Sequence, residues 1–483
     1  MTAAALAKVN SPPQFEIVLL ESEDIGTIGV GEATIPTIHW FNNLADLSEG
    51  ELLRETQATY KLGIEFVGWN GEGSRYFHPF GRYGGAQDAS MFYHRWIRAQ
   101  LGGATDDHHA YSLTTQAARA GKFAPPASDP SSIFATLGYA YHFDASLYAA
   151  FLRRRAESKG VRRIEGKLVR VEQDPASGFV RSLTTHRDEV IAGDLFVDCS
   201  GLRALLIEGA LKTGFDDWSH WLPCDRALAV PSERAQDPIP YTRSTAHAAG
   251  WQWRIPLQHR TGNGIVYSSS FCSDEDAAAT LLSRLDSRAL AEPRPIRFLA
   301  GQRKKAWNKN VVAIGLSSGF LEPLESTSIH LIQSGIAKLL SLFPTRDCHP
   351  ETAEQFNRVF AADVESIRDF LVLHYHYSTG RSEPFWRHCQ HTPAPEGLAY
   401  KAAHFTHTGR IVLQPEELFK EASWFAVMRG QGFVPSDYNP LLDCISDADN
   451  RSHLLHVKQQ ISAALTSMPR HEEYIQRGLR SLK

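Results

Sequence analysis

The alternation of hydrophobic and polar residues predicts an α/β protein. Short apolar runs and one alternating run are typical of strands and cover 15–20, 60–69, 195–198 and 311–315. In the second run Leu62, Ile64 and Phe66 face one side, while Lys61 and its alternate neighbours face the other. A β-hairpin is predicted across 161–185 with its turn at 174–178, and further strands are expected within 206–300.

Helical patterns fill much of the remaining chain. Helices are predicted over 2–9, 51–59, 144–159 and most of the chain after residue 353. A further helix begins near Ser328 and carries one apolar face, formed by Ile329, Ile332, Ile336, Leu339, Leu340 and Phe343. Loops with short helices are expected over 103–133, and turns at 383–386 and 430–432.

Composition narrows the class of protein. The 483 residues are 43% hydrophobic and 22% charged, as in ordinary globular proteins, and their length favours one large composite domain or two lobes. A net charge of −4 gives no reason to expect a nucleic-acid partner. The six cysteines show no metal-ligand spacing, so no metal site is expected. Without a signal peptide or an apolar run of about 18 residues, we expect a cytoplasmic protein with no membrane partner.

The segment 322–328 carries the most informative chemistry. It follows a buried strand and opens a helix, so Glu325 and the residues after it lie where free N–H groups and the helix dipole favour an anion. A carboxylate beside an anion site indicates chemistry that handles a halide or phosphate together with a proton. The alternative is that Ser326 or Thr327 is an ordinary N-cap.

The N-terminal region resembles the second half of a nucleotide-binding βαβ unit. Glu21 ends a predicted strand, where an acidic residue binds a ribose hydroxyl about 20 residues after a Gly-rich loop. The sequence contains neither that loop nor a first strand. We expect both to precede Met1, through truncation or a misassigned start; a different cofactor geometry is the alternative.

Six segments together resemble the flavin-dependent tryptophan halogenases. They are Gly29–Pro36, Tyr60–Phe66, Tyr141–Asp144, Asp198–Gly201, the Trp-x-Trp-x-Ile-Pro box at Trp251–Pro256, and Gly315–Ser328. Each alone could arise by chance, but all six occur in the order of the family, and the resemblance extends from Met1 to about Gly432. It implies an FAD-binding Rossmann-like (flavin monooxygenase-like) core with an added β-sheet. Residues 1–345 would form this core with the interleaved substrate sheet, and residues 346–483 a mainly helical part covering the substrate pocket.

The resemblance also assigns a cofactor site. It implies FAD, supplied reduced, and contacts from Gly29, Gly31, Glu32, Ala33, Asp198, Gly201, Gly315 and Leu324, with Glu21 at the ribose. Leu316 stands where related monooxygenases often have Asp, so no residue is assigned to the ribityl chain. A separate NAD(P)H-dependent flavin reductase, without a stable complex, would supply the reduced FAD.

Two residues match the catalytic positions of the family. Lys61 would hold and aim hypohalous acid, which reduced FAD, oxygen and halide generate, and Glu325 would stabilise the cationic aromatic intermediate and accept its proton. The alternatives are a surface lysine on a strand and a helix-start glutamate favoured by the dipole.

The remaining site residues follow from the same resemblance. Thr327 and Ser328 would bind chloride or bromide through backbone N–H groups, although the family usually has Gly at the second position. Trp251, Trp253, Ile255 and Pro256 would separate flavin from substrate, and His78, Pro79 and Phe80 would line the substrate pocket. The expected substrate is an indole or a similar electron-rich aromatic. A flavin monooxygenase and a truncated inactive flavoprotein or binding protein are the alternatives.

Overall fold

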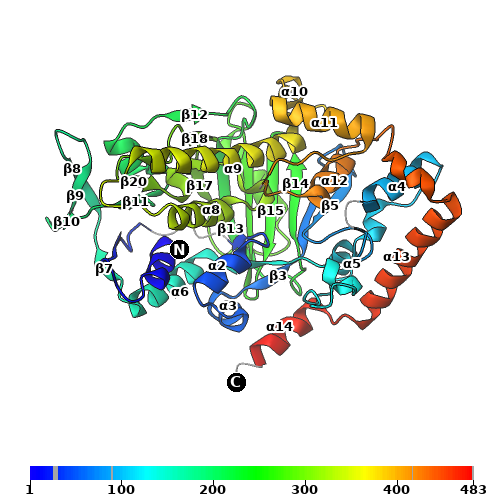
Figure 1. Cartoon of the computed structure of the whole chain (residues 1–483), viewed down its shortest axis with the longest axis horizontal. Coiled ribbons are helices and arrows are strands. Elements are labelled where there is room, and N and C mark those ends of the chain that lie inside the picture. The colour runs from blue at the N-terminus through cyan, green and yellow to red at the C-terminus, as the bar shows by residue number, and fades with distance from the viewer. Residues whose placement is uncertain (26–30, 89–90, 416, 481–483) are drawn as a thin grey trace.

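The computed structural model describes residues 1–25, 31–88, 91–415 and 417–480. It confirms the α/β class, with sheets wrapped by helices (Figure 1). The largest sheet lies in the middle of the molecule, and the long helix α9 (Pro350–His376) contacts β19 at one side and α10 to α12 at the other.

Two parallel strand pairs form the part expected to bind a nucleotide. β1 pairs in parallel with β7, and β11 pairs in parallel with β20, which is also antiparallel to β19. The bounds of these strands are β1 Val18–Glu21, β7 Arg162–Glu165, β11 Phe196–Asp198, β19 Trp307–Asn308 and β20 Val311–Ala313. One apolar cluster joins both pairs and includes Ile164, Phe196 and Val311. The prediction of a missing first strand and Gly-rich loop is not confirmed.

Five helices pack around these strands: α1 Thr2–Val9, α2 Ile38–Leu44, α3 Glu49–Thr56, α6 Ala145–Ser158 and α8 Ser328–Ser341. Side-chain caps mark the start of two of them, α3 and α6. Ser48 and Glu51 form a reciprocal capping box at α3. The Asp144 carboxylate accepts hydrogen bonds from the first free N–H groups of α6. The predictions for α1, α3 and α6 are therefore confirmed within a few residues.

The predicted apolar face of α8 is partly wrong. Ile336 and Leu339 are buried, and Ile329 and Ile332 are half-buried. Phe343 lies beyond the end of α8, with 41% of its surface exposed, and stacks on Phe15 at 5.3 Å between ring centroids. The helix ends before its apolar period does, so the last position does not reach the core.

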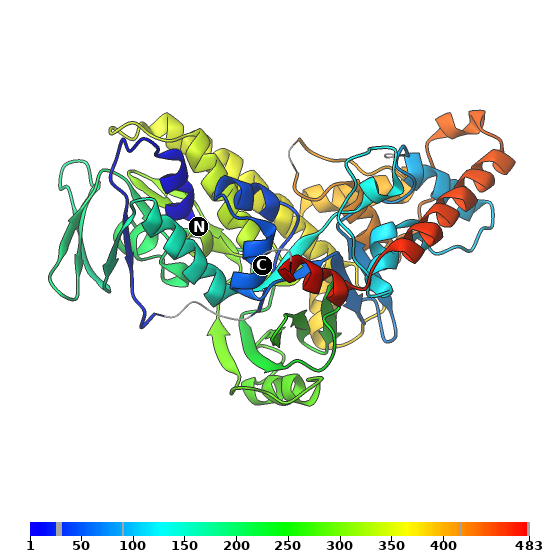
Figure 2. The same ribbon diagram turned by 90° about the horizontal axis from the view of Figure 1, so that it is seen from below.

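The predicted hairpin of 161–185 splits into two structures. β8 (Leu168–Gln173) and β9 (Val180–Thr185) form the hairpin with its turn as predicted, and β10 (Val190–Ala192) extends it. The preceding β7 instead pairs with β1. Figures 1 and 2 both place this small sheet at the end of the molecule opposite α13.

The central sheet contains seven strands in the order β17-β13-β16-β15-β14-β4-β5. Their bounds are β4 Gly63–Val67, β5 Arg75–Pro79, β13 Arg226–Glu233, β14 Thr242–His247, β15 Gly250–Pro256, β16 Arg260–Tyr267 and β17 Arg294–Arg297. All neighbouring pairs are antiparallel except β14 with β4. β15 is buried along its whole length, so the Trp-x-Trp box lies inside the molecule.

A three-stranded sheet, β2-β6-β3, connects the nucleotide-binding part to the central sheet. Its strands are β2 Gly31–Ala33, β3 Thr59–Lys61 and β6 Ala140–Asp144. The single strand predicted for 60–69 is therefore wrong, because β3 ends at Lys61 and β4 begins at Gly63. Between them, Leu62 donates its N–H to the Pro240 carbonyl at 2.7 Å, which moves the chain from one sheet to the next.

The chain after residue 350 is mainly helical, as predicted. It forms α10 Pro384–His391, α11 Glu396–Thr408, α12 Glu421–Gly430, α13 Asp447–Ser467 and α14 His471–Arg480 after α9. The turn predicted at 383–386 is wrong, since Pro384 occupies the first turn of α10, where its missing N–H is no loss. The remaining elements are α4 Met91–Leu101, α5 Leu113–Arg119, α7 Asp274–Ser283, β12 Phe215–Asp217, β18 Gly301–Arg303 and β21 Gly319–Phe320.

Candidate active site

The segment Glu322–Ser328 makes a sharp reversal before α8. Pro323–Glu325 forms one 3-10 turn, and Ser326 then adopts a left-handed conformation with φ of 60°. This conformation is uncommon for a residue with a side chain and is concentrated at functional sites. Thr327 follows as the N-cap, so Glu325 precedes α8 rather than lying in its first turn.

Lys61 lies in the interior, which excludes the surface-lysine alternative. Its side chain is 0% exposed, and Nζ donates to the Thr34 carbonyl at 3.0 Å and to Ser326 Oγ at 2.8 Å. The amine also lies 4.8 Å from the centroid of the Phe80 ring. Burial lowers the pKa of Lys61 to about 7, although the Glu325 carboxylate opposes this shift. Near neutral pH the amine can therefore exchange a proton with a bound reactant.

The Glu325 carboxylate is buried and flanked by two imidazoles. Its Oε2 lies 2.8 Å from His78 Nδ1, and its Oε1 lies 2.9 Å from His374 Nε2. Burial raises the pKa of Glu325, but the two imidazoles outweigh this effect and bring it to about 2. The carboxylate is therefore ionised, and its position is fixed by these histidines rather than by the dipole of α8.

A chain of buried polar groups fixes the orientation of His374. Gln431 Nε2 donates to Tyr76 Oη at 3.1 Å and to the His374 carbonyl at 3.1 Å. His374 Nε2 faces the ionised Glu325 carboxylate at 2.9 Å and therefore carries a proton. Burial lowers the pKa of His374, so the ring is neutral and its Nδ1 accepts from the Tyr76 hydroxyl at 2.7 Å. The Phe66 ring stacks on the imidazole at 4.6 Å.

Aromatic rings gather beside Glu325. The His78 ring lies 6.1 Å from Phe80 and 5.9 Å from Phe419, and Phe419 stacks on Phe370 at 3.8 Å. Trp424 meets Phe370 edge-on at 4.9 Å. His78 and Pro79 end β5 and Phe80 follows, and His78 contacts the Glu325 carboxylate directly. Their role as a substrate-pocket wall stays a prediction. This cluster of rings combines residues from both sides of the predicted 345/346 boundary, and no observation tests that boundary itself.

The Trp-x-Trp box lies between β2 and the aromatic interior. Trp251 and Trp253 are buried on one face of β15 with ring centroids 6.0 Å apart. A Cβ on Gly31 would lie 3.3 Å from Ile255 Cγ2, so β2 passes directly over the box. The Pro256 carbonyl accepts a hydrogen bond from Thr59 Oγ1 at 2.8 Å, which ties the box to β3 beside Lys61.

The predicted halide residues lie at the start of α8. Thr327 is buried, and its hydroxyl has no hydrogen-bond partner within the part of the chain that the structure describes. Ser328 is the first residue of the helix, where N–H groups have no intrahelical acceptor. An unpaired hydroxyl beside free N–H groups forms a suitable anion site.

The cofactor residues divide into two groups. Gly201 has φ of 71° and open space where a Cβ would lie, and Gly315 has φ of 76°. These two turns follow β11 and β20, and Ser317 Oγ joins them by donating to the Asp198 carbonyl. The open, left-handed Gly201 turn can accommodate part of a dinucleotide close to the backbone.

Asp198 has a structural role in this turn. Its carboxylate accepts from Ser200 N and Oγ through Oδ1, and from Leu206 N and Ile207 N through Oδ2. All four interactions are internal, so Asp198 shapes the Gly201 turn, and direct contact with FAD stays a prediction. The Glu21 carboxylate at the end of β1 accepts from Arg153 and Arg163 through Oε1.

The remaining cofactor predictions concern β2 and the 322–328 segment. Gly29 lies outside the described residues. A Cβ on Gly262 would lie 2.8 Å from Gly31 N, so the two glycines permit close contact of β2 with β16. Burial raises the pKa of Glu32 to about 8, and Ala33 and Leu324 are buried. The set contains glycine turns and acidic groups at strand ends, which fit a flavin dinucleotide.

Sequence reasoning missed Ser326, His374, Tyr76 and Gln431. Ser326 lies inside the quoted motif, and only its hydrogen bond to Lys61 reveals a role. His374 lies on α9 and Gln431 directly after α12, and no spacing relates them to Glu325.

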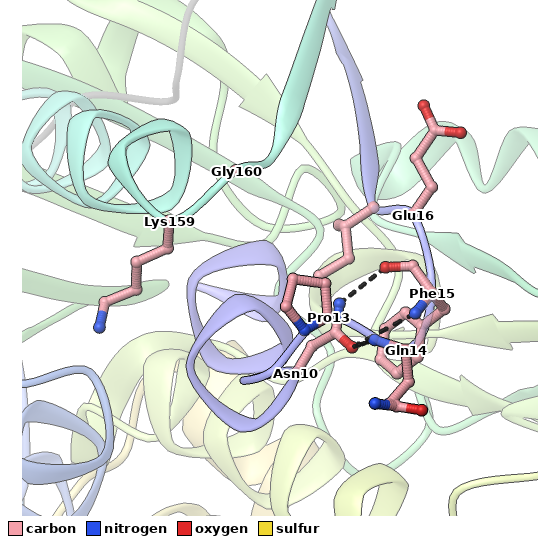
Figure 3. A pocket seen from close by; sticks show the side chains of 8 residues that line it. Asn10, Pro13, Gln14, Phe15, Glu16, Lys159 and Gly160 are labelled. Atoms are coloured by element: carbon pink, nitrogen blue, oxygen red, sulfur yellow. Dashed lines mark hydrogen bonds between the residues drawn. The ribbon is translucent and has the colours of Figure 1, made fainter.

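Two other features lie outside this site. Figure 3 shows a surface pocket lined by Asn10, Pro13, Gln14, Phe15, Glu16, Ile17, Lys159 and Gly160. Asn10 there donates to the Phe15 carbonyl and accepts from Gln14 N, each at 2.7 Å, so it stabilises its own loop. Asp107, His108 and His109 also place potential metal ligands within 4.8 Å of one another. His109 Nε2 already accepts from Phe77 N, which assigns the proton to Nδ1 and disfavours that nitrogen as a ligand.

Among the described residues, no helix is long and apolar enough to cross a membrane.

Comparisons with known proteins agree with this geometry. The family model described as tryptophan halogenase matches residues 1–447. The tryptophan 6-halogenase SttH of Streptomyces toxytricini is 32% identical over 506 residues, covering 98% of this chain and 95% of the relative. The tryptophan 7-halogenase RebH of Lentzea aerocolonigenes is 33% identical over 463 residues, covering 88% and 86%.

Two solved structures are also similar. Xcc4156, a flavin-dependent halogenase from Xanthomonas campestris, superimposes with a TM-score of 0.94 at 45% identity, covering 99% of this chain and 95% of that chain. BrvH, a flavin-dependent halogenase from Brevundimonas sp. BAL3, gives a TM-score of 0.94 at 44% identity, covering 99% and 96%.

Fold and site together define a flavin-dependent halogenase, an enzyme with a Rossmann-like FAD-binding fold. More narrowly, the chain belongs to the tryptophan halogenase family. The predicted family and activity are confirmed, and nothing in the comparisons favours the monooxygenase alternative.

Proposed function

We propose that the enzyme uses reduced FAD, oxygen and chloride or bromide to halogenate a neutral, electron-rich aromatic, and that indole is its preferred type of substrate. One observation carries this proposal. A buried lysine and a buried, ionised glutamate lie beside the same aromatic rings around Phe80, and the Ser326 turn joins them.

The cofactor would be held by the turns that follow the parallel strands. Gly201 and Gly315 would accept the dinucleotide backbone, Glu21 would bind the ribose through its remaining oxygen, and β2 would lie against the flavin ring. Bound reduced FAD, with oxygen, supplies the oxidising equivalents that convert the halide into hypohalous acid. A separate NAD(P)H-dependent flavin reductase would deliver the reduced cofactor without a stable complex.

The start of α8 would bind the halide. The Thr327 hydroxyl and the N–H groups around Ser328 supply donors, and the positive end of the helix dipole favours an anion. The replacement of Gly by Ser at 328 leaves the backbone donor intact. Trp251, Trp253, Ile255 and Pro256 would keep substrate apart from the flavin side, so that only hypohalous acid reaches it.

Lys61 would hold and activate the hypohalous acid. Its ammonium form donates a hydrogen bond to the hydroxyl oxygen of HOX, and Ser326 and the Thr34 carbonyl aim it. The aromatic carbon attacks the halogen, the O–X bond breaks, and the hydroxyl leaves as water with a proton from Lys61. A pKa near 7 makes this proton transferable.

Glu325 would complete the substitution. The attack leaves a cationic ring that carries both hydrogen and halogen on one carbon. The ionised Glu325 stabilises this cation and accepts the ring proton, which restores aromaticity. His78 and His374 hold the carboxylate in place, since each faces one of its oxygens.

The charges near the pocket favour a neutral substrate. Lys401 and Glu417 are both buried and pair with each other at 2.6 Å, and Lys401 lies 4.9 Å from the Trp424 ring. The two opposite charges cancel, so the pair presents no net charge to an ammonium or a carboxylate, although Glu417 Oε2 has no hydrogen-bond partner among the described residues. Free indole would therefore bind better than the zwitterion tryptophan.

A product assay tests the proposal. The enzyme, FAD, NADH and a flavin reductase are incubated with a panel of indoles and either chloride or bromide, and products are analysed by mass spectrometry. We expect singly halogenated indoles whose halogen follows the salt supplied. Oxygenated products independent of halide would overturn the proposal, as would an absence of halogenated product with every indole.

A further inference from the structure

Glu322 is a second buried carboxyl group on the turn that carries Glu325, and the mechanism above assigns it no step. Its side chain is inaccessible to solvent, and Oε2 accepts from Trp251 Nε1 at 2.8 Å and from Tyr375 Oη at 2.6 Å. Its Oε1 has no hydrogen-bond partner among the residues that the structure describes. No arginine or lysine pairs with it within that part of the chain.

This arrangement has an energetic cost that a purely structural contact would not require. A buried polar oxygen without a partner has lost its hydrogen bonds to water and destabilises the folded protein. Burial raises the pKa of Glu322 to about 7, against the hydrogen bonds from Trp251 and Tyr375. The facing titratable groups are the Tyr375 phenol and the thiols of Cys224 and Cys389, whose pKa values burial also raises. The surroundings of Glu322 therefore disfavour the ionised carboxylate, and among the described residues only Trp251 and Tyr375 offset this effect by hydrogen bonds.

The two donors on Glu322 belong to one aromatic cluster. Tyr375 on α9 stacks on Trp386 at 5.6 Å and meets Trp69 edge-on at 5.4 Å. Trp69 in turn lies 6.4 Å from Trp251. Contacts between apolar ring surfaces set no single orientation, whereas a hydrogen bond to the indole N–H of Trp251 fixes one.

We propose that Glu322 is the positioning residue of the tryptophan barrier: its carboxyl group fixes the indole of Trp251 and thereby keeps halide oxidation coupled to halogenation of the substrate. This inference rests on the proposed function of the Trp-x-Trp box.

The geometry of the turn connects this anchor to the catalytic carboxylate. Glu322 and Glu325 flank Pro323 and Leu324 in one short 3-10 turn; Pro323 has a fixed φ, and Leu324 is buried. The barrier and Glu325 are therefore held by one rigid segment. A displacement of Trp251 would open a second path for hypohalous acid, which then escapes or oxidises the protein.

The first test measures the indole directly and requires neither FAD nor substrate. The enzyme is labelled with ¹⁵N at its tryptophan side chains, and the Trp251 N–H signal is assigned by its loss in Trp251→Phe. We expect Glu322→Gln, which keeps the shape of the side chain, to move this signal more than any other indole signal. Asp274→Asn is the control, because Asp274 accepts from the Tyr267 hydroxyl at 2.8 Å, and Tyr267 pairs with Gly250 and packs against α7 on the other face of the sheet from Trp251. An unchanged Trp251 signal in Glu322→Gln would overturn the inference.

The second test measures coupling, as halogenated product formed per reduced flavin consumed. We expect Glu322→Ala to lower this ratio about 10-fold to 100-fold, as misplacement by about 1 Å can do, while flavin oxidation continues. Glu322→Gln should recover part of the loss, and a soluble hypohalite trap should collect the missing halogen. Full coupling in folded Glu322→Ala would refute the role. If the wild-type enzyme forms no halogenated product while the indole signal still responds, the proposed function fails and the anchor stands.

Discussion

The amine of Lys61 and the hydroxyl of Ser326 lie 2.8 Å apart, although Lys61 ends β3 and Ser326 lies 265 residues further along the chain, in the turn before α8. Ser326 presents its hydroxyl because its backbone adopts the left-handed conformation between Glu325 and Thr327. Three adjacent residues of one turn thus supply the carboxylate, the contact to the lysine and the unpaired hydroxyl at the proposed halide site. This turn sets the distances on which the chemistry depends.

Lys61→Ala should abolish halogenation, because the group that holds and aims the hypohalous acid is lost. Reoxidation of reduced FAD by oxygen should continue, since that reaction does not need the amine. Product analysis and oxygen consumption, measured in parallel, check both expectations. The exposed Lys305→Ala serves as a control and should retain activity. Halogenation by Lys61→Ala at near wild-type rate would exclude this lysine from the mechanism.

Burial of Lys61 should also appear in the pH dependence of stability. Its pKa falls from 10.5 in the unfolded chain to about 7, so between these values the unfolded chain binds more protons than the folded protein. The contribution of Lys61 to the free energy of unfolding therefore rises with pH across this window, by up to about 1.4 kcal/mol per pH unit.

Lys61→Met removes this dependence. Its stability relative to wild type should be most favourable at pH 7 or below and should decline steadily toward pH 10. Urea unfolding of both proteins at several pH values measures the difference. Lys305→Met, at an exposed position, is the control and should show a constant difference. A flat difference for Lys61→Met would mean that the buried amine titrates as it does in water.

Glu325→Gln should slow halogenation strongly, by about 10²–10⁴-fold, because a neutral amide neither stabilises the cationic ring nor accepts its proton. Steady-state rates with the best substrate measure this effect. Glu233→Gln, at a surface position that pairs with Arg288, should leave the rate unchanged. A rate within a few-fold of wild type for Glu325→Gln would remove the carboxylate from the mechanism.

Free indole should be a better substrate than tryptophan, because Lys401 and Glu417 neutralise each other beside the pocket. Side-by-side kinetics with indole, tryptamine and tryptophan check this expectation. The value of kcat/KM should fall in that order, because the three compounds carry zero, one and two charged groups. A preference for tryptophan would show that charged groups elsewhere in the pocket bind its ammonium and carboxylate.

Local patterns predicted much of the fold because they arise from local physics. The strand 311–315, the helix after Asp144 and the turn of the 161–185 hairpin depend on neighbouring residues, and all three are confirmed. The single strand 60–69 is wrong because the interruption at Leu62 comes from Pro240, a residue of another segment. Likewise, β7 leaves the predicted hairpin because β1 offers a parallel partner.

The site shows the same limit more sharply. Lys61 and Glu325 follow from a motif, but the alternating pattern around Lys61 gives no sign that both faces of that strand are buried. Tyr76, His374 and Gln431 meet only in three dimensions, and each residue type has ordinary uses elsewhere. The role of Asp198 could not be read from its motif either, since its four hydrogen bonds depend on the path of the chain after β11.

The short gap between β3 and β4 has a consequence for engineering. Lys61 ends a strand of the small connecting sheet, and Gly63 begins a strand of the central sheet. The position of the Lys61 amine therefore depends on the relative orientation of the two sheets. Substitutions far from Lys61 and Glu325 that rotate either sheet slightly should lower the rate of halogenation before they lower the melting temperature. Directed-evolution libraries aimed at activity should therefore include residues packed between these two sheets as well as the aromatic residues beside Glu325.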